Sequence, residues 1–227
     1  MNLINWIKKI LGFKFNQPER VLWVWNIDDK EINNLIKFCW KKNIKRVFIS
    51  NLTKQKQNEL FENGIDSSLL IGIQSPINVK SLLEFIEKNK DFKIHLDIEQ
   101  KDGDTNFLRD YEEILKTGKY EVDAQCGQPK EYWEMLNKYA ESVYLMSYRD
   151  NARDIRNFAQ IGLKWLKTPF YLGIETGEVK ETPFISFFGK TNEQLELEIA
   201  KLNIYYMFNK NYKGQAIHYF KTYQELK

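Results

Sequence analysis

The chain has 227 residues, of which 43% are hydrophobic and 15% aromatic, a composition that excludes a disordered polypeptide and suffices for one large domain. The net charge is only +3, and no Lys/Arg-rich block occurs, so we expect no nucleic-acid partner. No apolar run reaches the ~18 residues that a membrane span needs. Cys39 and Cys126 lack metal-ligand spacing, and we expect both to be buried free thiols.

The N-terminal stretch MNLINWIKKILGFKF is amphipathic but makes a poor signal peptide. Lys8 and Lys9 interrupt its apolar part, and no small-residue cleavage site follows. We interpret residues 1–18 as a short helical extension that plugs the bottom of the domain. The alternatives are contact with a membrane surface through residues 1–15 or a degenerate signal or anchor. The missing signal favours the cytoplasm, with secretion or the cell surface as the alternative.

Short apolar runs rich in β-forming residues recur along the chain and are typical of strands. They cover 21–26, 46–50, 68–74, 93–99, 120–126, 142–148, 170–176 and 215–220. Segments with apolar residues three and four apart alternate with them and predict helices. The clearest of these cover 31–43, 78–90, 105–118, 131–140, 154–166 and 193–210.

Strands that alternate with helices indicate parallel strands joined by helical crossovers. Eight such units predict an α/β fold, a single (β/α)8 TIM barrel over residues 19–227, in a chain slightly shorter than the ~250 residues usual for that fold. An open doubly wound sheet is the competing fold. It is disfavoured because Asn26-Ile27-Asp28-Asp29 follows the first strand in place of a glycine-rich phosphate loop.

One connection is unusually long. Residues 177–193 separate the seventh strand from its helix and contain Phe187 and Phe188. Long loops that follow barrel strands lie on the active face, so we interpret this loop as a wall or lid of the pocket.

Polar and aromatic residues gather where the predicted strands end, which is the catalytic end of a barrel. This placement predicts a polar ring with aromatic walls. The side chains that we expect to bind substrate are Trp25, Asn26, Gln74, Gln125, Arg149, His218 and Tyr219.

The fourth strand, KIHLDIEQ, carries the most informative pattern. Its alternation places His95, Asp97 and Glu99 on one face. In a barrel that face points inward, and buried acids must be paired or functional. An interior polar network explains the pattern without catalysis. The functional interpretation is an acid pair in which Asp97 raises the pKa of Glu99 and keeps it protonated.

Leu96-Asp97-Ile98-Glu99 resembles the second half of the DxxDxDxE signature of chitinase-like, family 18 glycoside hydrolases. Met146-Ser147-Tyr148 is similar to the M-x-Y motif of that family. The resemblance implies a glycan substrate, with Glu99 as general acid and with Asp97 and Tyr148 holding the reacting sugar. It implies no cofactor and no metal.

The sequence departs from that family at several positions. His95 replaces the first Asp of DxDxE, and Arg149 follows Tyr148 where the family has Asp. These departures keep open a barrel that has lost catalysis and binds a glycan or a protein.

The strand ends are also compatible with three different kinds of hydrolase. Glu175 ends the seventh strand and could pair with Glu99 as the nucleophile of a retaining glycosidase. His95 and His218 with Asp97 and Glu99 could form a metal-dependent hydrolase. The two histidines could instead serve a phosphodiesterase, although no His-Arg-Gly-like segment follows the first strand.

Overall fold

Eight parallel strands, each hydrogen-bonded to the next and the last to the first, form a closed barrel. The computed structural model describes residues 18–226 of the protein. The strands are β1 (Glu19–Val24), β2 (Arg46–Ile49), β3 (Asp66–Gln74), β4 (Ile94–Glu99), β5 (Glu121–Gln125), β6 (Ser142–Met146), β7 (Phe170–Glu175) and β8 (Tyr212–His218). The predicted (β/α)8 TIM barrel is confirmed, whereas the predicted N-terminal extension falls almost wholly outside the described residues.

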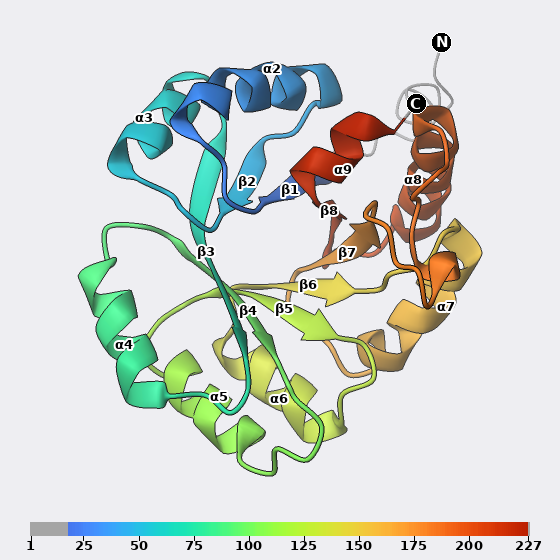
Figure 1. The fold of residues 1–227 in the computed structure, drawn as a ribbon. Helices are drawn as coiled ribbons and strands as arrows, with labels where there is room; N and C mark the ends of the chain where they lie inside the picture. The colour runs from blue at the N-terminus through green and yellow to red at the C-terminus, as the bar shows by residue number, and fades with distance from the viewer. Residues whose placement is uncertain (1–17, 227) are drawn as a thin grey trace.

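A ring of helices surrounds the strands (Figure 1). They are α2 (Ile32–Lys42), α3 (Lys54–Glu62), α4 (Val79–Lys88), α5 (Phe107–Leu115), α6 (Lys130–Tyr139), α7 (Ala152–Leu163), α8 (Asn192–Tyr206) and α9 (Phe220–Glu225). Two 3-10 turns, η1 (Asp29–Glu31) and η2 (Pro183–Ile185), lie in loops. None of the helices among residues 18–226 is both long and apolar enough to cross a membrane.

The alternation of side chains along each strand divides the buried residues into two groups. The larger group lies between strands and helices and contains Ile94, Leu96 and Ile98 of β4. The smaller group fills the barrel interior with Trp23, Phe48 and five other residues. His95 stacks on Phe48 at 3.7 Å between ring centroids, which places the polar face of β4 inside the barrel as predicted.

Side-chain caps set the start of several helices. Asn78, Asn151 and Thr191 each accept a hydrogen bond from the backbone N–H three residues ahead, at the N-termini of α4, α7 and α8. Cys39 and Cys126 are buried free thiols, as expected.

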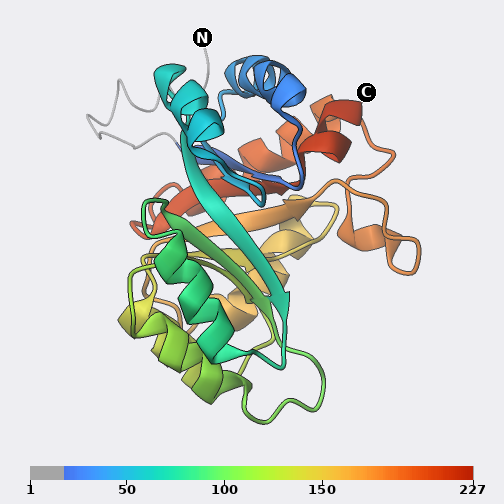
Figure 2. The same cartoon turned by 60° about the vertical axis from the view of Figure 1, so that its left-hand side comes forward.

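The long connection between β7 and α8 extends beyond the carboxyl ends of the strands (orange loop in Figure 2). It then returns to the barrel, where Phe187 N–H donates to the Glu175 carbonyl at 2.9 Å. Lys190 anchors the loop by an ion pair with Asp150, at 2.7 Å. The loop therefore forms a wall beside the end of β7.

Candidate active site at the carboxyl end of the barrel

A histidine–carboxylate pair links the ends of β7 and β8. Glu175 and His218 are register partners on these strands, and Glu175 Oε2 lies 2.6 Å from His218 Nδ1. The other carboxylate oxygen accepts from the Gly177 N–H at 2.5 Å. Both oxygens of Glu175 are thus held in place, and Nδ1 of His218 donates its proton to the carboxylate.

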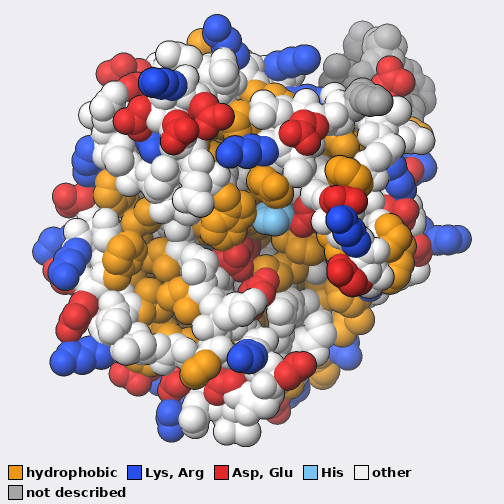
Figure 3. Space-filling view, in the orientation of Figure 1, with side chains coloured by type: hydrophobic (Ala, Val, Ile, Leu, Met, Phe, Trp, Pro, Cys, Tyr) orange, Lys and Arg blue, Asp and Glu red, His pale blue; other side chains and the backbone are white. Residues whose placement is uncertain are grey.

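The imidazole of His218 reaches the surface. Figure 3 shows one histidine near the centre of this face, between hydrophobic and acidic side chains. It must be His218, because His95 is 0% exposed. Burial alone lowers the pKa of His218, but the hydrogen bond and charge of Glu175, with the charges of Asp123 and Asp97, raise it above its ordinary value.

Two carboxyl groups lie together on the adjacent strands β4 and β5. Burial and the neighbouring Asp123 raise the pKa of Asp97 to about 8. Burial also raises the pKa of Asp123 well above its usual range, although the Trp23 indole N–H donates to its Oδ2 at 3.1 Å. Because these two side chains interact, they titrate as a coupled pair in which both pKa values are raised.

Tyr148 and Glu99 complete the polar ring. Burial raises the pKa of the Tyr148 hydroxyl well above its usual range, and nearby carboxylates, including those of Asp123 and Glu175, add to the shift. The Tyr148 ring stacks on His218 at 6.0 Å between centroids. Glu99 is half-buried, and its side chain forms no hydrogen bond or ion pair within residues 18–226. Its carboxylate is therefore available to a ligand.

Aromatic side chains line this ring of acids. The Trp25 indole N–H donates to His218 Nε2 at 3.0 Å. Trp25 and Tyr219 are partly buried and pack on the interior group of the barrel. The peptide bond between His218 and Tyr219 is cis. In contrast, Phe187, which we expected in the pocket wall, is 0% exposed and belongs to the outer core.

Several residues predicted to bind substrate lie at the rim or turn away. Asn26 bonds to Ser50, Gln74 is exposed, and Gln125 accepts from Gln128. Arg149 was expected in the ring, but its guanidinium carbon lies 3.9 Å from the ring centroid of Phe158 on α7. The cation is thus turned toward the helix layer, because the aromatic face there stabilises it.

The structure does not bring His95 and His218 together in a group of metal ligands. His95 is fully buried, its ring stacks on Phe48, and burial lowers its pKa to about 4. Its Nε2 lies 3.1 Å from Asp123 Oδ1 without hydrogen-bonding geometry. In the part of the chain that the structure describes, no group of three or more His, Cys, Asp or Glu residues could hold a metal ion.

Asp123 and Trp23 were not among the predicted site residues. Nothing in YEVDAQC shows that Asp123 meets Asp97. Trp23 lies one hundred positions away and donates to it. The available signal was register: two inward acids on adjacent parallel strands lie side by side.

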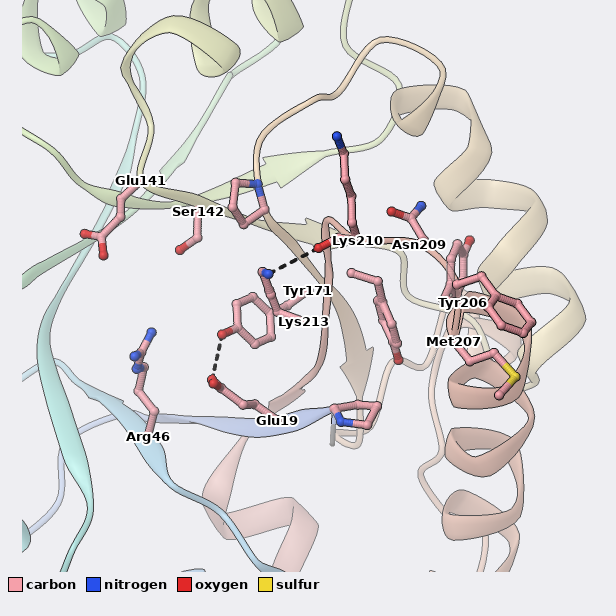
Figure 4. A pocket seen from close by; sticks show the side chains of 14 residues that line it. Glu19, Arg46, Glu141, Ser142, Tyr171, Tyr206, Met207, Asn209, Lys210 and Lys213 are labelled. Atoms are coloured by element: carbon pink, nitrogen blue, oxygen red, sulfur yellow. Dashed lines mark hydrogen bonds between the residues drawn. The ribbon is translucent and has the colours of Figure 1, made fainter. Parts of the chain in front are cut away.

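A large cavity opens at the opposite, amino-terminal end of the barrel (Figure 4). Its volume is about 870 Å³, and residues at the starts of β1, β2, β6, β7 and β8 line it. Tyr171 donates to Glu19 there at 2.7 Å. The cavity lacks the acids described above, and chemistry in barrels belongs to the carboxyl end, so we place the candidate site at the carboxyl end.

Neither a protein-family model nor a curated protein matches the sequence. Among solved structures, the protein is similar to endonuclease IV from Thermus thermophilus. The two chains are 9% identical with a TM-score of 0.50, over 89% of this chain and 91% of that one. The similarity supports the TIM-barrel fold.

This comparison corrects our functional prediction. The neighbour is an endonuclease and not a glycosidase, so the predicted carbohydrate-cleaving enzyme, with a glycan partner and no nucleic acid, is wrong. The resemblance to the chitinase-like family extends to the barrel and no further. The geometry agrees, since Glu175 is bound to His218 and the Gly177 N–H and is not free to act as a nucleophile.

Proposed function

We propose that the protein is a hydrolase that cleaves phosphodiester bonds of a nucleic acid by acid–base catalysis. One arrangement carries this proposal: a surface-reaching imidazole paired with Glu175, beside an Asp97 carboxyl group that keeps its proton near neutral pH. Catalytic acids and bases work best with pKa values near the working pH. The structural neighbour is an endonuclease, which supports a phosphodiester bond as the bond that is cleaved.

The charges of the site are compatible with an anionic substrate. Asp97 has a pKa of about 8 and is largely neutral at pH 7, and the pKa of Asp123 is also raised. The charge of Glu175 faces the His218 imidazole. Lys or Arg side chains lie above and to the right of that imidazole on the same face (Figure 3). The site therefore repels phosphate much less than its four carboxyl groups suggest.

In the proposed hydrolysis, each of these side chains has a defined role. Nε2 of His218 accepts a proton from water, and the water oxygen forms a bond to phosphorus. The bond between phosphorus and the leaving oxygen breaks, and that oxygen takes the proton of Asp97. Glu175 stabilises the imidazolium that forms. The proton on His218 then returns to Asp97 through solvent, which restores both groups.

The test is cleavage of labelled single-stranded and duplex DNA and RNA oligonucleotides. Replacing the base with H218Q, or the acid with D97N, should each slow cleavage by about 100-fold or more. E178Q is the matched control, because Glu178 is an exposed carboxylate in the loop just after Glu175. Each reaction is run with and without a strong chelator, since the proposed steps use only side chains.

The pH profile provides a second test of the same proposal. The base must be deprotonated, so the rate should rise as pH passes the raised pKa of His218. The acid must be protonated, so the rate should fall again as Asp97 loses its proton near pH 8. Lack of cleavage of every oligonucleotide, or cleavage that H218Q leaves unchanged, would refute the proposal.

A further inference from the structure

Both ring nitrogens of His218 are occupied. Nδ1 faces Glu175 Oε2 at 2.6 Å, and Nε2 accepts the indole N–H of Trp25 at 3.0 Å. An indole nitrogen can only donate a hydrogen bond. Nε2 must therefore be the unprotonated nitrogen of a neutral imidazole, and Trp25 occupies the lone pair that a base needs.

The indole is held in a fitted position. Its ring lies against Gly72 of β3, where an added Cβ would approach the ring to 2.8 Å. The next residue, Asn26, has a φ of 49° and is fixed by a hydrogen bond from its N–H to Ser50 Oγ. Asn26, with a left-handed backbone conformation just after β1, and Gly72 on β3 together hold the indole against His218. The local backbone therefore fits the contact between Trp25 and His218.

Protonation of His218 conflicts with this contact. A protonated imidazole carries N–H on both nitrogens, so Nε2 and the indole N–H would be two donors facing each other. The proton and the indole therefore exclude one another at Nε2.

We propose that Trp25 is a positioning residue that caps Nε2 of His218 and must move before that nitrogen can take a proton. This inference rests on the proposed function, in which Nε2 is the base. A ligand that enters the site displaces the indole, and the base is then exposed only beside a bound substrate. At low pH the proton displaces the indole without a ligand.

The charged and titratable groups around His218 come from three strands and from the residues that follow β6 and β8. Glu175 lies on β7, and its hydrogen bond and charge raise the pKa of His218 most. Asp123 on β5 and Asp97 on β4 add to that shift when they are charged, and the ring of Tyr219 lies beside the imidazole. Tyr148 follows β6 and stacks on the ring. These carboxyl groups favour the protonated imidazole, whereas the Trp25 N–H favours the neutral one. Removing the indole N–H should therefore raise the pKa of His218 further.

The experiment is an NMR titration of the imidazole nitrogens in the full chain, which has only two histidines. His95 is buried with a pKa of about 4 and serves as an internal reference. W25F keeps a ring beside Gly72 but removes the donor. We expect the pKa of His218 to rise by about half a unit to one unit in W25F. The wild-type Trp25 indole N–H signal should shift with the same midpoint.

H218Q is the matched control, because its side-chain carbonyl can still accept from the indole and does not titrate. In H218Q the Trp25 N–H signal should lose its pH dependence. An unchanged His218 pKa in W25F would overturn the inference, as would an indole signal that does not titrate in the wild type. Neither readout needs turnover, so the capping role survives if oligonucleotide cleavage is absent, and the two proposals fail separately.

Discussion

The two ends of this barrel hold buried carboxyl groups in opposite ways. At the amino end, Glu121 is 0% exposed and fully partnered. Its oxygens meet Arg46 at 2.7 Å, Lys93 at 3.1 Å and the hydroxyl of Ser68 at 2.6 Å. Tyr144 donates to it as well. This carboxylate is buried at little cost, because cations and donors replace its water.

At the carboxyl end, the acids lack such partners. Asp97 Oδ1 and Asp123 Oδ1 are buried without a hydrogen bond in the described part of the chain. No Lys or Arg forms an ion pair with either group within residues 18–226. Their pKa values rise as a result. Unpaired buried acids weaken the fold, so their presence indicates a function, whereas the paired Glu121 indicates stability.

The largest effect should come from breaking the amino-end network. E121Q removes the charge that holds Arg46 and Lys93 and places an amide N–H₂ near those donors. Removing one partner of a buried ion pair is strongly destabilising, and we expect a loss of about 3 kcal/mol in the free energy of unfolding. Urea unfolding at pH 7 measures it.

The matched control for E121Q is E141Q. Glu141 pairs with the same Lys93 at 2.9 Å, but 46% of its side chain is exposed. An exposed pair contributes about 0–1 kcal/mol, so E141Q should change little. Equal effects of the two variants would show that the amino-end network does not stabilise the barrel.

A change of opposite sign is expected at the carboxyl end. The folded state keeps a proton on Asp97 up to about pH 8, whereas an unfolded Asp loses it near pH 4. Between these values the folded chain binds more protons, so the free energy of unfolding falls as pH rises. D97N cannot lose a proton at this position, so its free energy of unfolding should not fall in this way. It should match wild type near pH 4 and be more stable than wild type by a few kcal/mol at pH 8.5.

Urea unfolding at both pH values checks the D97N prediction, and the difference between them is the informative quantity. A variant that is less stable than wild type at pH 8.5 would mean that Asp97 has a stabilising partner in the folded state. The comparison between the two ends of the barrel would then not hold.

The strand pattern could be predicted from sequence because it is local. All eight strands were located, and the inward face of KIHLDIEQ is as expected. Helix α3 was missed because KQKQNELFE is mostly polar and buries only Lys56 and Leu60. The eighth strand was placed too far along the chain: β8 covers Tyr212–His218, and Phe220 already belongs to α9.

The pairings within the site could not be predicted, because they join residues far apart in sequence. Glu175 and His218 are 43 positions apart, and Trp25 and His218 are 193 apart. Pairing depends on barrel register and rotamers, which periodicity does not determine. Arg149 shows the limit: its position at the end of β6 was correct, but its side chain turns to Phe158.

The smallest predicted effect concerns Glu175, the carboxylate at the carboxyl end that is paired with His218. Glu175 raises the pKa of His218 above the ordinary value. The resulting stability is fully present below the unfolded pKa of about 6.5 and is lost as pH rises through the folded value. E175Q removes the charge, and burial then lowers the His218 pKa. The variant should therefore lose about 1 kcal/mol more at pH 5.5 than at pH 8.5.

Urea unfolding of E175Q at the two pH values, with an NMR titration of His218, checks this prediction. E178Q serves as the control from the same loop and should show no difference between the two pH values. A pH-independent loss in E175Q would mean that Glu175 stabilises the loop through the Gly177 N–H alone. The carboxyl end would then contain no ion pair comparable to that of Glu121.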